Sequence, residues 1–166
     1  MASQGSPDDS LFEKSRVSLK VTKEGAEQFF QQHGVFYESN TEIGKLAATI
    51  APSVALNNSR GLDRFKEIYM REPRLRFLQQ YREDFAFVIG ADDYYYCSTT
   101  KDAAAKDRIS VYMLRPGTLL RFGKGGHALS FEPLDETVYK LCAIPYIQIE
   151  SRCEEVRVIF ESGGIC

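Results

Sequence analysis

The side chains best suited to chemistry lie in residues 115–131, RPGTLLRFGKGGHALSF, where a strand and a glycine cluster lead to His127. Imidazole titrates near neutral pH and therefore both accepts and donates protons. We expect His127 to act as a catalytic acid or base inside a barrel mouth. The alternative is a histidine whose ring nitrogens bond to nearby backbone.

Arg121 is the second candidate catalytic residue. It alternates with Leu120 and Phe122, so it lies on the opposite face of its strand from these two apolar side chains. If Arg121 points inward, its guanidinium would bind a carboxylate or enolate with two parallel hydrogen bonds. If it points outward, it is a solvated strand residue, and the alternation alone leaves both orientations open.

Polar side chains on neighbouring strands are the candidate substrate-binding residues. Tyr94, Tyr96 and Ser98 belong to one predicted strand, and Tyr112 belongs to another. Tyrosines that line a cavity would suit a polar, partly unsaturated ligand. The alternative is that tyrosine simply packs well on a half-buried strand.

No metal or other cofactor is expected. The histidines are His33 and His127, and no two cysteines are spaced as CxxC. A three-ligand transition-metal centre or a zinc finger is therefore not predicted. No redox cofactor motif appears either.

The chain is long enough for one domain, with 43% hydrophobic and 27% charged residues, which is typical of a globular protein. We expect residues 1–14 to be a disordered polar tail and 15–166 to be a single domain. Within that domain, 15–84 read as a strand plus helices and 85–160 as barrel strands.

Several local signals define the expected elements. Thr22 is a candidate N-cap for a helix that stops at Gly34. Ser39 and Glu42 have the spacing of a capping box before a second helix, which Pro52 ends. A third helical stretch covers 62–69, and residues 75–81 are ambiguous. The expected later strands are 85–89, 94–98, 109–114, 118–122, 128–131, 138–149 (broken at Pro145) and 156–160.

The strand, glycine turn and histidine resemble the second half of a cupin motif. Read in order, the chain resembles the ureidoglycolate lyase family, also called ureidoglycolate hydrolase. The matching segments are LKVTKEGAEQFFQQHGVFYESN, DFAFVIGADDYYYCSTT, RISVYMLRPGTLLRFGKGGHALSFEPLDETVYKL and SRCEEVRVIF. The sequence departs from the family's histidine-rich signature, because Arg121 stands where a histidine is expected and the chain has no tryptophan.

The resemblance implies an α+β fold, mainly β: a small cupin-like antiparallel barrel, or jelly roll, with N-terminal helices packed outside. It also implies a homodimer, and an activity that splits ureidoglycolate into glyoxylate and urea. An α+β cone, in which helices pack into the mouth of a curved open sheet, is the alternative fold.

Two functions compete. The first is a metal-independent lyase or isomerase/cyclase that acts on a small polar or carboxylate-bearing metabolite through His127 and Arg121. The second is a non-catalytic small-molecule-binding or interaction module on a degenerate enzyme scaffold. With 21 basic against 23 acidic residues, a nucleic-acid partner is not expected. No membrane association is expected, and we expect a cytoplasmic location.

Overall fold

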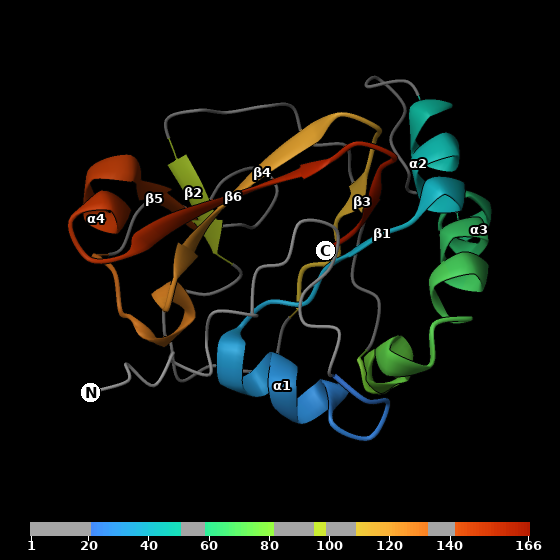
Figure 1. The fold of residues 1–166 in the computed structure, drawn as a ribbon, viewed down its shortest axis with the longest axis horizontal. Coiled ribbons are helices and arrows are strands. Elements are labelled where there is room, and N and C mark those ends of the chain that lie inside the picture. Colours follow the sequence, from blue (N-terminus) through green and yellow to red (C-terminus); the bar gives the residue numbers. More distant parts are fainter. Residues whose placement is uncertain (1–20, 51–58, 82–94, 99–108, 133–141) are drawn as a thin grey trace, which may run out of the picture.

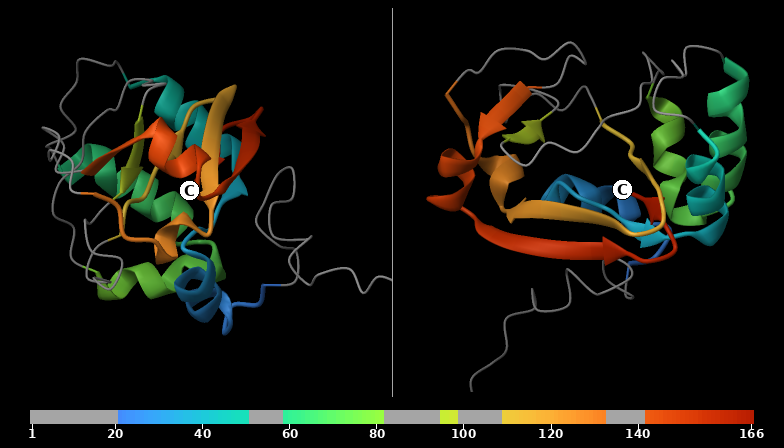
Figure 2. Two further views of the ribbon diagram at one scale, coloured as in Figure 1. Left: turned by 90° about the vertical axis from the view of Figure 1, so that its left-hand side faces the viewer. Right: turned by 90° about the horizontal axis from the view of Figure 1, so that it is seen from above.

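The computed structural model describes residues 21–50, 59–81, 95–98, 109–132 and 142–166, with the backbone alone for 59–62 and 95–98. Over these residues the fold is α+β, with helices and antiparallel strands (Figure 1). Seen from above, β4 (Thr118–Lys124) and β6 (Glu154–Phe160) form a long ribbon. At one end of this ribbon lie helix α4 (Tyr146–Glu150) and strand β5 (Cys142–Pro145), and at the other lie helices α2 (Thr41–Ala48) and α3 (Ser59–Tyr69) (Figure 2).

Helix α1 spans Ala26–His33 and ends as predicted at Gly34, whose φ of 71° is left-handed. Its N-cap is Gly25 rather than Thr22, although the Thr22 hydroxyl accepts a hydrogen bond from the Gly25 N–H at 3.2 Å. A glycine at this C-terminal position adopts the left-handed conformation without the steric penalty of a Cβ atom.

Helix α2 spans Thr41–Ala48, and Asn40 caps it instead of the expected Ser39. The Asn40 Oδ1 accepts a hydrogen bond from the Ile43 N–H at 2.9 Å. Ser39 lies one residue too early because it belongs to strand β1, Glu38–Ser39. The predicted capping box is therefore wrong, and an asparagine performs the same function.

Helix α3 spans Ser59–Tyr69, and the ambiguous stretch after Pro73 is a 3-10 helix, η1, over Pro73–Gln80. The Glu72 carboxylate caps η1 by accepting from the Arg74 N–H at 3.0 Å. Arg74 also forms an ion pair with Glu38 of β1. This arginine therefore ties the helical layer to the first strand.

The remaining strands are β2 (Tyr95–Ser98), β3 (Met113–Leu114), β4 (Thr118–Lys124), β5 (Cys142–Pro145), β6 (Glu154–Phe160) and β7 (Gly164–Ile165). They form one three-stranded sheet, ordered β1-β7-β3, and two pairs, β2-β5 and β4-β6. Every pairing in this set is antiparallel. The described strands do not close into a barrel, so the structure does not confirm a cupin jelly roll.

Three strand predictions need correction. Residues 128–131 form no strand, because Gly125 adopts a φ of 80° and leads into a 3-10 turn, η2, over Gly126–Ala128. Beyond Pro145, the expected strand is instead a short helix, α4, over Tyr146–Glu150. Of the strand expected over 109–114, only Met113–Leu114 is observed, as β3. The strand expected at 85–89 lies outside the described residues.

The core joins the helical layer to one face of the β4–β6 ribbon. Its largest fully buried side chains are Tyr37, Phe65, Phe160 and Ile43. The Tyr37 ring stacks on Phe122 of β4 at 5.7 Å and meets Phe160 of β6 edge-on at 5.6 Å. Offset-stacked and edge-to-face contacts are the favoured aromatic geometries. This contact fixes which face of the ribbon is buried.

Candidate functional site: an arginine pair on the outer ribbon face

The register of β4 against β6 assigns each side chain of the ribbon to one of two faces. Phe122 pairs with Val156, and Leu120 pairs with Val158; all four pack in or against the core. Side chains of a strand point alternately to opposite faces. The intervening pairs, Leu119–Ile159, Arg121–Arg157 and Gly123–Glu155, therefore share the outer face.

Arg121 thus lies on the face turned away from the core, which is the outward one of the two orientations that its sequence pattern leaves open. It is half-buried and sits directly opposite Arg157 in the antiparallel register. Among the described residues, no hydrogen bond or ion pair is made by the Arg121 side chain. Arg157 differs, because its Nε–H donates to the Glu155 carboxylate two residues earlier on the same face.

Helix α4 covers one end of this outer face. The Tyr146 hydroxyl donates a hydrogen bond to the Glu155 Oε2 at 3.1 Å. A Cβ atom on Gly123 would lie only 2.8 Å from the Ile149 Cγ2, so the glycine allows α4 to approach the ribbon closely. The hydrogen bond to the Glu155 carboxylate raises the pKa of Tyr146, whereas the positive charge of Arg121 opposes this rise.

The other end of the outer face is apolar and open. Leu119 and Ile159 pair across the strands and remain 44% and 56% exposed. We call the whole surface the arginine face; its residues are Leu119, Arg121, Tyr146, Glu155, Arg157 and Ile159. Two guanidinium groups and one carboxylate give it an excess of positive charge, so it is chemically suited to holding an anionic group.

His127 lies elsewhere, on the turn η2, and its side chain is exposed rather than directed into a barrel interior. Its Nε2 is 2.9 Å from the Gln32 carbonyl oxygen near the end of α1. A carbonyl oxygen only accepts hydrogen bonds, so the Nε2 carries the proton. The expected inward orientation is therefore wrong, and the backbone-bonded alternative describes this histidine.

The structure does not bring the two predicted catalytic residues onto one surface. His127 contacts the C-terminal end of α1, whereas Arg121 faces α4. The sequence predicted His127 as a catalytic residue because it follows a glycine turn. In the structure that turn packs the ring against Gly34, where an added Cβ would lie 2.3 Å from the His127 Cβ.

The predicted tyrosine site is only partly described. Tyr112 is half-buried against the core, and its backbone exchanges hydrogen bonds with Cys166 at 2.7 and 3.0 Å. It therefore does not belong to the arginine face. Tyr96 and Ser98 pair through β2 with Ile144 and Cys142, but their side chains, and all of Tyr94, lie outside the described residues.

The thiols of Cys153 and Cys166 are poor nucleophiles. Burial raises the pKa of Cys153, and it raises the pKa of Cys166 to about 12. Because the thiolate is the reactive form, both side chains stay protonated at neutral pH.

No cluster of three or more metal-ligating side chains occurs among the residues that the structure places. None of the helices in that same set combines the length and the apolar character needed to cross a lipid bilayer.

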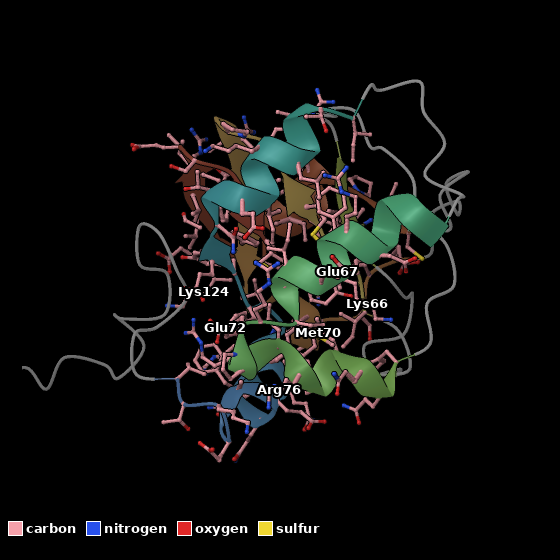
Figure 3. All side chains as sticks on the ribbon, turned by 90° about the vertical axis from the view of Figure 1, so that its right-hand side faces the viewer. Lys66, Glu67, Met70, Glu72, Arg76 and Lys124 are labelled. Atoms are coloured by element: carbon pink, nitrogen blue, oxygen red, sulfur yellow. The ribbon has the colours of Figure 1, made fainter. Side chains whose placement is uncertain are left out.

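A groove of about 570 Å³ lies between α2 and α3, at the opposite end of the ribbon from α4. Its lining combines the apolar side chains of Leu46 and Ile68 with charged side chains from both helices. Figure 3 shows the charged side chains on this side, including Lys66 and Glu67 of α3. Two of the lining residues, Arg71 and Glu42, form an ion pair at 3.1 Å. The groove contains none of the predicted site residues.

Arg121 was the one residue of the arginine face among the sequence candidates; the other five, Leu119, Tyr146, Glu155, Arg157 and Ile159, were not. Glu155 and Arg157 alternate with Val156 and Val158, so the strand pattern already separates them from the apolar side chains. The pairing of Arg157 with Arg121 has no such signal, because it joins distant parts of the chain.

Comparisons with protein-family models, with curated proteins and with solved structures gave no match for this chain.

Proposed function

We propose that this chain is a binding module that recognises a carboxylate group through Arg121. One observation carries the proposal: the half-buried Arg121 guanidinium makes no hydrogen bond or ion pair with any other described residue, and it lies directly opposite a second guanidinium on the same sheet face. This is the non-catalytic function among the two that the sequence offers. The sequence names a carboxylate-bearing ligand only for the catalytic alternative, and the proposal extends that ligand class to the binding module.

Charge balance favours an anion at this position. Like charges directly opposite on neighbouring strands destabilise a sheet. Glu155 forms an ion pair with Arg157, and no carboxylate of the described residues forms one with Arg121. A carboxylate placed between the two strands would accept the two parallel hydrogen bonds of the Arg121 fork and relieve the repulsion.

An NMR titration tests this proposal directly. Isovalerate, an aliphatic carboxylate, should shift the arginine Nε–Hε resonance of Arg121, whereas neutral isovaleramide should not. The Arg121→Gln protein should lose the response. Arg76→Gln is the matched control, because Arg76 is an exposed arginine on η1. If no carboxylate shifts the Arg121 resonance, or if isovaleramide shifts it equally, the proposal is wrong.

Lyase or isomerase chemistry rests on the family resemblance and stays a prediction. Incubation of the purified protein with ureidoglycolate, followed by measurement of glyoxylate, tests it. Turnover abolished by His127→Ala in a protein that remains folded would restore the catalytic function. Unchanged turnover in that variant would remove His127 from it.

The cupin-like barrel is likewise a proposal, supported by strand pairings that are all antiparallel over the described residues. An experimental structure would decide between this barrel and the α+β cone. The homodimer is tested by sedimentation, and the cytoplasmic location is tested by cell fractionation.

A further inference from the structure

The two arginines of the arginine face each have an aliphatic neighbour. Leu119 precedes Arg121 by two residues on β4, and Ile159 follows Arg157 by two residues on β6. The aliphatic pair lies side by side and is about half exposed. In a strand, two residues span roughly 6.5 to 7 Å, so a positive group and an apolar group repeat at that spacing on both strands.

We infer that the partner is an extended acidic peptide segment in which an Asp or Glu side chain lies two residues from an aliphatic side chain. The inference rests on the proposed carboxylate binding and adds the class of ligand. The acidic side chain would meet Arg121, and the aliphatic side chain would cover Leu119 and Ile159.

Two arguments favour a peptide over a small metabolite. An extended peptide has the same two-residue repeat as the ribbon, so its charged and apolar side chains align with both groups at once. Small-molecule sites are concave and bury most of the ligand surface. The arginine face is open instead, with Ile159 56% exposed and the Arg157 side chain 61% exposed.

Charge complementarity fixes the sign of the partner, and α4 limits where it lies. The face presents two cations against one carboxylate, Glu155, which already bonds to Arg157 and to Tyr146. Because Ile149 of α4 covers the Gly123 end of the ribbon, the free surface runs from Arg121 toward Leu119.

Binding of short blocked peptides to the full-length protein tests the inference. The first peptide, Ac-Thr-Ile-Thr-Glu-Thr-amide, places Ile and Glu two residues apart. Its isomer Ac-Thr-Ile-Glu-Thr-Thr-amide places them adjacent, on opposite sides of an extended chain. A third peptide replaces Glu with Gln. We expect the first peptide to bind about tenfold more tightly than either of the other two.

Substitutions in the protein separate the apolar contact from the charged one. Leu119→Ser and Ile159→Ser should each weaken the first peptide about tenfold while leaving the shift of the Arg121 resonance by acetate unchanged. Val111→Ser is the matched control, because Val111 is also an exposed aliphatic residue, at 39%, but lies outside this face. It should bind the peptide as the unsubstituted protein does.

Equal binding of the first peptide and its isomer would overturn the inference. If acetate still shifted the Arg121 resonance in that case, carboxylate binding itself would stand. If neither acetate nor isovalerate gave a shift, both proposals would fail. Sedimentation adds another decisive outcome: a dimer that Leu119→Ser dissociates would mean that a second copy of the chain, not a peptide, covers this face.

Discussion

His127 and Gln32 are joined by a hydrogen bond of 2.9 Å between the imidazole Nε2 and the main-chain oxygen, although 95 positions separate them in the sequence. The last four carbonyl groups of a helix have no partner within that helix. His127 satisfies one of them at the end of α1. A residue with the sequence features of a catalytic base therefore acts as a helix cap that fastens α1 to the turn after β4.

This contact predicts that His127→Ala lowers the free energy of unfolding. The expected loss is about 1 kcal/mol, the typical net contribution of one intramolecular hydrogen bond. Chemical denaturation measures it, and Ser130→Ala, at an exposed position just beyond the turn, is the control. Unchanged stability in the His127 variant would show that the hydrogen bond does not hold α1.

Gly34 predicts a coupled effect. Gly34→Ala should destabilise the protein by more than the roughly 1 to 2 kcal/mol that the left-handed conformation costs a residue with a Cβ atom. The excess arises because the new Cβ would collide with the His127 side chain. Alanine at position 127 would keep the colliding Cβ atom, whereas the double variant Gly34→Ala/His127→Gly removes it. The loss of this double variant should therefore be smaller than the sum of the losses of Gly34→Ala and His127→Gly. Strict additivity would contradict the contact.

The helix cap of α2 provides a test between adjacent residues. Asn40→Ala should cost about 1 kcal/mol, since its Oδ1 caps the first turn. Ser39→Ala should change stability by less than about 0.5 kcal/mol, because Ser39 makes no such cap. Thermal unfolding of the two variants measures the difference. A larger loss at Ser39 would restore the capping box that the sequence predicts.

Tyr146 and Glu155 predict a pH effect in the alkaline range. Because the hydrogen bond to Glu155 raises the pKa of Tyr146 above its ordinary value of 10.0, the folded state favours the protonated phenol. This contribution to stability is complete below pH 10 and is lost as the pH rises through the folded-state pKa. Glu155→Gln should lower the pKa of Tyr146. NMR titration of the tyrosine Cζ, assigned with Tyr146→Phe, measures both values, and identical values in the two proteins would contradict the interaction.

The sequence predicted those elements whose formation depends on a few neighbouring residues. The left-handed glycine at the end of α1 and the alternating apolar residues of β4 and β6 are examples, because each follows from a few consecutive side chains. The strand expected over 128–131 is wrong because the turn before it, at Gly125, folds on into a 3-10 helix.

The candidate site was harder to predict because its contacts join distant segments. Alternation showed that Arg121 and Phe122 occupy opposite faces, but only the packing of Tyr37 against Phe122 shows which face is buried. The contact of His127 with Gln32 likewise has no signal in either segment. Strand periodicity therefore separates the two faces of the ribbon, and tertiary contacts assign them.

The central position of β7 in its sheet has a consequence for folding kinetics. Ile165 pairs with Glu38 on one side and with Met113 on the other, and Gly163 accepts the backbone N–H of Asn40 at 3.1 Å. Each pairing closes a long loop, and its entropic cost is paid before the hydrogen bonds compensate it. High contact order of this kind slows folding. We expect assembly of this sheet to be a late step, since a protein synthesised only as far as β6 would have β1 and β3 without the strand that joins them.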